Sequence, residues 1–131
     1  MNNLVVAHYL DGKLLKGTSL DVDPARPAFH VRPVDGATAE VKLKDLKALF
    51  FVRSLEGNMA HNEARALDPA DPRMHGSTAV SLQFPDGEVL VGLTNRFPPI
   101  RPFFFVVPVD PESNNIRVLV NRSAVKKMDP L

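Results

Sequence analysis

The side chains best placed to do chemistry are two arginines at matching points of the chain. Arg26 and Arg101 each stand in an Arg-Pro-x-Phe string. An arginine in such a loop can hold it through an ion pair or carbonyl bonds, or can bind the phosphate or carboxylate of a ligand. Arg101, Arg96 and Asn95 also flank Phe97-Pro98-Pro99, which permits a small anion site. The sequence leaves both roles open for these arginines.

The other reactive residue types form no catalytic or metal-binding pattern. The chain has no cysteine, and none of its four histidines is spaced from another as metal ligands on one element are. No serine stands in G-x-S-x-G, and neither of the usual glycine-rich phosphate loops is present. Asp11, Asp86, Asp35 and Asp110 fall in turns, where aspartates bond local backbone N–H groups. We therefore expect no catalytic residue, metal or cofactor.

A repeat organises the chain. With a shift of 75 positions, residues 5–35 align with residues 80–110 without a gap, and 13 positions are identical, where chance gives about two. Beyond this window we align Val41-Lys42-Leu43 with Val118-Leu119-Val120. The repeat divides the chain into copies at 1–53 and 78–131.

Residues 54–77 between the copies are acidic and contain few large apolar side chains, which is typical of a linker. We expect a short helical turn through Asn62–Leu67. His61 and His75 lie in this segment, and we interpret both as solvated surface residues.

Each copy carries the turn signals of a small all-β unit. Asp11-Gly12 and Asp86-Gly87 are strong hairpin signals, and Gly17 and Gly92 mark bends within the following strand. Leu49–Val52 is apolar on both faces, as in a central strand or a sealed edge. The other expected strands are Leu4–Leu10, Ala28–Arg32, Ala39–Leu43 and Lys47–Arg53, then Ala79–Phe84, Phe103–Val107, Ile116–Val120 and Ala124–Met128. The sequence predicts two tandem small bent-sheet β-barrels, which bury surface against each other because each alone has a marginal core.

The copies differ most on one face of their third strand. Phe29 and Phe104 are expected to point inward. The opposite face changes from mixed to wholly apolar: it reads Ala28, His30 and Arg32 in the first copy and Phe103, Phe105 and Val107 in the second. Burial against the first copy or the linker, a partner or self-association surface, and a small-molecule pocket all remain open explanations.

Each copy resembles the small bent-sheet barrel of Sm-like proteins, through Asp-Gly-x-x-x-x-Gly followed by a third strand and two apolar strands. This resemblance implies RNA binding and ring assembly. However, neither copy has the second Sm motif, an apolar residue followed by Arg-Gly-Asp/Asn, so the architecture carries over and RNA binding does not. The strings Phe-x-Val-x-Pro and Leu-Lys-Ala-Leu-Phe-Phe-Val resemble an uncharacterised bacterial domain family with no assigned activity.

Composition narrows the function further. The formal net charge is +1, and no apolar run approaches the roughly 20 residues of a membrane span. Without cysteine, the chain fits a reducing compartment, so we expect a cytoplasmic protein with no membrane association. We expect a non-catalytic protein-interaction or regulatory module with a protein partner or self-association, acting through sheet edges or the Phe103/Phe105 face. The alternative is an Sm-like RNA-binding protein, which the near-neutral charge disfavours, and an enzyme ranks third.

Overall fold

The computed structural model describes residues 3–57, 63–64 and 70–131. His61 lies outside these residues, as does most of the segment Asn62–Leu67 for which a helical turn is predicted.

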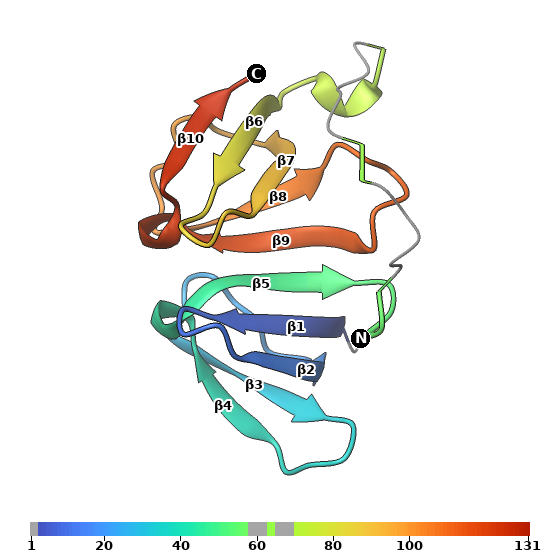
Figure 1. Ribbon diagram of the computed structural model, residues 1–131, viewed down its shortest axis with the longest axis vertical. Coiled ribbons are helices and arrows are strands. Elements are labelled where there is room, and N and C mark those ends of the chain that lie inside the picture. The colour runs from blue at the N-terminus through green and yellow to red at the C-terminus, as the bar shows by residue number, and fades with distance from the viewer. Residues whose placement is uncertain (1–2, 58–62, 65–69) are drawn as a thin grey trace.

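The described chain is all-β, as the sequence predicts, and its ten strands form one antiparallel sheet (Figure 1). The strand order is β10-β6-β7-β8-β9-β5-β1-β2-β3-β4. Three single-turn 3₁₀ helices also occur in the described residues: η1 (Leu43–Asp45), η2 (Pro72–Met74) and η3 (Arg122–Ala124). The strands are β1 (Asn3–Tyr9), β2 (Leu14–Ser19), β3 (Ala28–Pro33), β4 (Ala39–Lys42), β5 (Leu46–Val52), β6 (Thr78–Gln83), β7 (Val89–Thr94), β8 (Phe103–Pro108), β9 (Asn115–Asn121) and β10 (Lys127–Pro130).

The sheet is not closed, so strand pairing does not give the two barrels that the sequence predicts. β4 and β10 are its two edges, and the outer side of β5 pairs with β9 from the other part of the chain. We call β1–β5 the first half and β6–β10 the second half. The last strand was predicted at Ala124–Met128, which begins too soon in the sequence. η3 occupies residues 122–124, and β10 begins only at Lys127.

The two halves share one strand order and one pairing register. Val5 pairs with Gly17 in the first half, and Val80 pairs with Gly92 in the second, which reproduces the shift of 75. In the later strands the shift is 79. Phe29 pairs with Val41, and Phe104 pairs with Val120. We call positions related by these shifts equivalent.

The predicted alignment of Val41 with Val118 is therefore wrong by two residues. The four extra residues of the second half lie between Pro108 and Val118, in the β8–β9 loop and the longer start of β9, and the sequence alone assigned only two of them to this stretch. Since two residues preserve the facing of a strand, the error left the inward and outward sides unchanged.

Glycines act at the two kinds of position that the sequence marks. Gly12 and Gly87 both have φ of 92°, which a hairpin turn requires and which other residues rarely adopt. At Gly17, an added Cβ would overlap the backbone carbonyl of Arg32, and at Gly92 it would lie 2.6 Å from the Val107 carbonyl oxygen. The strands after the hairpins therefore approach the third strands too closely for a side chain.

The halves are joined where β5 pairs with β9 (Figure 1). Alternate side chains of these strands enter different cores. Leu49, Phe51 and Leu119 belong to the first-half core. Phe50 and Val118 belong to the second-half core. Every residue of β5 is buried for this reason, which explains why Leu49–Val52 is apolar on both faces. Each such side chain contributes about 1.5–3 kcal/mol on full burial.

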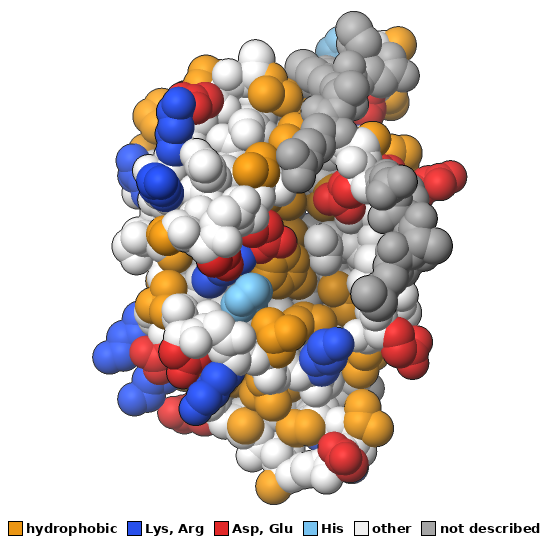
Figure 2. All heavy atoms as spheres, viewed as in Figure 1, with side chains coloured by type: hydrophobic (Ala, Val, Ile, Leu, Met, Phe, Trp, Pro, Cys, Tyr) orange, Lys and Arg blue, Asp and Glu red, His pale blue; other side chains and the backbone are white. Residues whose placement is uncertain are grey.

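A buried lysine also crosses the junction. Lys47, on β5, lies 2.7 Å from Asp86 and forms a second ion pair with Glu88, both in the β6–β7 hairpin. Its ammonium also lies 4.6 Å from the ring centroid of Phe84. Burial, together with the charge of Lys47, lowers the pKa of the neighbouring His8. On the face of the molecule shown in Figure 2, charged and histidine side chains gather around a central apolar hollow.

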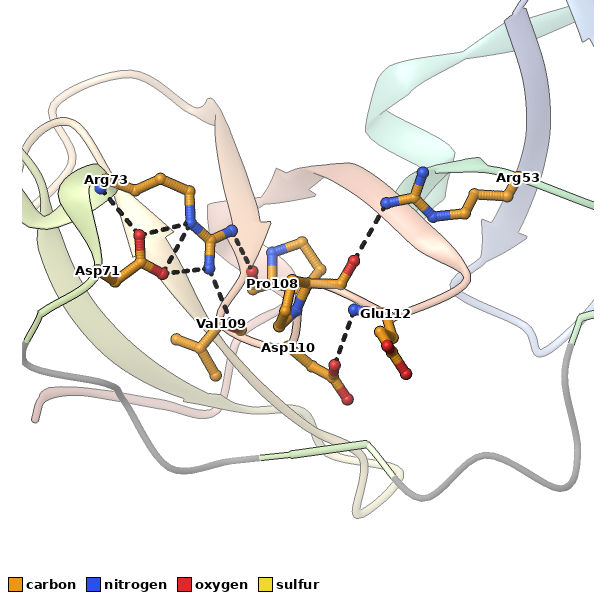
Figure 3. Close-up of polar contacts among 8 residues, drawn as sticks. Arg53, Asp71, Arg73, Pro108, Val109, Asp110 and Glu112 are labelled. Atoms are coloured by element: carbon orange, nitrogen blue, oxygen red, sulfur yellow. Dashed lines mark hydrogen bonds and ion pairs between the residues drawn. The ribbon is translucent and has the colours of Figure 1, made fainter.

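The end of the linker is held to the second half by arginine (Figure 3). Arg73 forms an ion pair with Asp71 at 2.6 Å and donates hydrogen bonds to the carbonyls of residues 108–109 at 2.9–3.0 Å. Arg53 donates to the Pro111 carbonyl on the same loop. These contacts fix the loop between β8 and β9 from two directions.

Candidate functional site

A concavity lies where β7 ends, a proline-rich connection follows and β8 begins. We call it the second-half cavity, and its volume is about 340 Å³. Its lining residues are Pro24, Thr94, Asn95, Arg96, Pro99, Ile100, Arg101, Phe103, Phe104 and Phe105. Prolines stiffen this connection because each has a fixed φ. The structure thus brings together the Arg96/Arg101 pair and the Phe103/Phe105 face, which the sequence singled out separately.

The two arginines of this cavity, Arg96 and Arg101, are exposed. Neither Arg96 nor Arg101 forms an ion pair with any residue that the structure describes. Arg26, at the position equivalent to Arg101, lies outside the cavity and pairs with Asp23 at 3.6 Å. Arg26 thus has an ion pair of the kind that a loop-holding role uses, whereas Arg101 has none among the described residues.

The apolar outer face of β8 is partly covered by the first half. Phe103 and Phe105 are half-buried and pack against the first-half core. The Phe105 and Phe51 ring centroids are 6.1 Å apart, and the Arg117 guanidinium lies 4.3 Å from the Phe51 centroid and 4.7 Å from that of Phe105. Val107 is half-buried as well. Both Phe103 and Phe105 also line the second-half cavity.

A second concavity adjoins the first, because Phe103 lines both. This bridging cavity has a volume of about 430 Å³ and is otherwise built by the first half. It is lined by Pro27, Ala28, Glu40, Lys42, Leu43, Lys44 and Phe103. Lys42 and Lys44 have no ion pair among the described residues. The two cavities together therefore present four cations, Arg96 and Arg101 included, against the single carboxylate of Glu40.

The equivalent place in the first half holds a different cavity, of about 400 Å³, which we call the first-half cavity. In it, His30 Nδ1 lies 2.7 Å from an Asp21 carboxylate oxygen. This hydrogen bond raises the pKa of His30 and lowers that of Asp21. Ser19 Oγ lies 3.3 Å from Asp21 and donates to the His30 carbonyl at 2.7 Å. Because the carboxylate stands between hydroxyl and imidazole, the order is not that of a nucleophile activated by histidine.

The sequence reasoning missed the Asp21–His30 pair and the two lysines of the bridging cavity. A signal for the pair was available in the repeat alignment, where Asp21 falls on Arg96 and His30 falls on Phe105. Both members of the pair change together between the halves. No comparable signal marked Lys42 or Lys44, because they share a cavity with Phe103 only once β5 has paired with β9.

The two free sheet edges are poorly suited to contacts. Lys127 and Asp129 of β10 occupy the positions equivalent to Ala48 and Phe50 of β5, which enter the other core. On the opposite edge, Glu40 of β4 is equivalent to the buried Leu119 of β9. Short, charged edge strands oppose further pairing. Of the two contact routes that the sequence suggested, the edges are thus the less favourable.

A family model for a family of unknown function, DUF6982, matches residues 1–131. The chain belongs to this family. No curated protein and no solved structure matches this DUF6982 chain. Within its described residues, no His, Asp and Glu side chains gather into a group of three or more that could hold a metal ion. No helix in the same part of the chain is long and apolar enough to cross a membrane.

Proposed function

We propose that the chain is a non-catalytic protein-interaction module that binds a partner protein on the face formed by the second-half and bridging cavities. The observation that carries this proposal is that two adjoining cavities combine half-buried or exposed apolar side chains with cations that have no ion pair among the described residues. Ile100, which lines it, is 70% exposed. Aromatic and arginine side chains grouped in concave sites are typical of the residues that dominate protein–protein affinity.

We also propose that the two halves are Sm-like bent sheets derived from one duplicated unit and fused through β5 and β9. The common strand order and the shared register of Gly17 and Gly92 support this origin. In this proposal, pairing of β5 with β9 removes one free edge from each half. Charged residues on the remaining edge strands, β4 and β10, oppose their pairing.

RNA binding is the second candidate, because the cation-lined surface includes phenylalanines on which bases could stack. Three observations weigh against it. The Phe105 ring is already packed against Phe51 and Arg117, the bridging cavity contains Glu40, and the net charge of the chain is only +1. Nucleic-acid-binding proteins rely on a stronger basic field.

The test is affinity capture from the native host with wild type, an Ile100→Ser variant and an Ala25→Ser control. Ala25 is the exposed position equivalent to Ile100 and lies outside the cavities. We expect a protein that wild type and the control retain equally and that Ile100→Ser retains at least about fivefold less. Melting temperatures should be unchanged, because Ile100 is largely exposed.

Nuclease treatment separates the two candidate functions. A retained protein that resists nuclease supports the proposal. Co-purifying RNA whose removal releases the protein, or equal capture by Ile100→Ser, contradicts it.

A further inference from the structure

We infer that the partner presents an acidic segment with two large apolar side chains, one for each cavity on either side of Phe103. This inference rests on the proposed function and adds the chemistry of the partner. It follows from the charged residues that line the two cavities, from the apolar residues that line them, and from Phe103, which lines both.

Charge gives the first step. Arg96 and Arg101 line the second-half cavity, and Lys42 and Lys44 line the bridging cavity. All four are exposed, none has an acidic partner in the described part of the chain, and only Glu40 offsets them. A partner with carboxylates near both cavities would pair with cations that are otherwise uncompensated, which favours selection and fast association.

The apolar surfaces give the second step. Ile100, Phe103 and Phe105 offer apolar contact in the second-half cavity. Pro27, Ala28 and Phe103 offer it in the bridging cavity. Since Phe103 is common to both, one continuous segment can occupy the two cavities with a side chain on each side of this ring. Carboxylates beside these anchors would then face the flanking arginines and lysines.

The composition of the walls favours a protein segment over a nucleic acid. The second-half cavity includes Pro24 and Pro99, and the bridging cavity includes Pro27, so part of each wall gives a base no aromatic face on which to stack. A second copy of this chain at its own edges is disfavoured by Lys127 and Asp129 on β10.

The test uses the full chain and fluorescein-labelled synthetic peptides, with fluorescence anisotropy as the measurement. The main probe has leucines flanked by glutamates in a glycine–serine background. One control peptide replaces glutamate by lysine, a second replaces leucine by alanine, and a uridine octamer represents RNA. We expect the main probe to bind at least about tenfold more tightly than each of these three.

Two charge-reversal variants locate the site. Arg101→Glu should weaken binding of the main probe by about tenfold, because it reverses a cation in the cavity. Arg26→Glu, the matched change at the equivalent position, should weaken binding clearly less than Arg101→Glu does, because Arg26 lines neither cavity and pairs with Asp23.

Tighter binding of the lysine peptide or the uridine octamer would overturn the inference, as would equal effects of Arg101→Glu and Arg26→Glu. These failures are distinct from failure of the proposed function. A captured protein that depends on Ile100 but is not displaced by the main probe refutes only the acidic segment. Capture that is indifferent to Ile100→Ser refutes the interaction surface itself.

Discussion

The first-half and second-half cavities occupy the same place in the same strand order, but their side chains are used differently. In the first, Asp21 is bound by His30 and Ser19. In the second, the position of Asp21 is held by Arg96, which has no ion pair among the described residues, and that of His30 by Phe105. The first-half cavity thus pairs its acidic residue with an imidazole, whereas the second-half cavity has an arginine at that position with no ion pair among the described residues.

Position in the sheet explains the difference. β8 is separated from the first half only by β9, so its outer face lies over the neighbouring core. β3 lies next to the free edge β4, and of its outer face only Ala28 shares a cavity with a residue of the second half. Apolar residues are stabilised at Phe103 and Phe105, while exposed His30 and Arg32 suit the solvated face of β3. The two halves share one strand order but differ in surface, because β8 lies one strand from the β5–β9 junction whereas β3 lies beside a free edge.

The largest expected effect comes from making the second half imitate the first. The double variant Phe103→Ser, Phe105→His removes two half-buried rings from the first-half core, so we expect it to lower the free energy of unfolding by about 3 kcal/mol. Urea denaturation measures this change. The control, Ala28→Ser, should stay within about 0.5 kcal/mol of wild type. Equal stability of the double variant and wild type would show that the face does not depend on the first half.

A smaller loss is expected where both halves have the same constraint. Gly92→Val should cost about 2 kcal/mol, because its side chain would overlap Val106 and the Val107 carbonyl. Gly17→Val should behave in the same way. At Gly36 an added Cβ meets only ordinary contacts at 3.6–3.7 Å with Pro33, so Gly36→Val is the control for thermal unfolding. A Gly92→Val melting temperature equal to that of Gly36→Val would remove the close-approach argument.

The smallest effect concerns the ion pair that only the first half possesses. The pKa of His30 should lie above its ordinary value of 6.5 because Asp21 bonds the imidazolium, and Asp21→Asn should bring it back down. An NMR titration of the histidine side chains measures both values. His8, whose pKa burial lowers, is the internal control and should not respond to Asp21→Asn.

The sign of the pH dependence follows from these shifts. The raised pKa of His30 means that its pairing stabilises the fold fully below pH 6.5, and this contribution is lost as the pH rises through the folded-state value. The lowered pKa of Asp21 means that its contribution is lost only as the pH falls below 3.8 and through the folded-state value. A His30 pKa at or below 6.5 would show that the pair does not form in solution.

Local patterns determined much of this protein. The Asp-Gly dipeptides predicted both hairpins, because the positive φ of Gly12 and Gly87 is a requirement of the turn itself. The alternation of apolar and polar residues predicted that Val5 and Val80 point inward, and both are buried. Successive side chains of a strand point to opposite faces, so this pattern is readable from the sequence. Leu49–Val52 is apolar on both faces, which likewise predicted a strand that is covered on both sides.

Only the tertiary structure decided what covers those faces and which residues share a cavity. Pairing of β5 with β9 joins segments about 70 residues apart, and no local propensity encodes that choice over closing each half on itself. The same pairing places Phe105 beside Phe51, and Lys42 and Lys44 in one concavity with Phe103. Separation along the chain hides such neighbours, because they meet only when long-range strand pairing and sheet curvature are both in place.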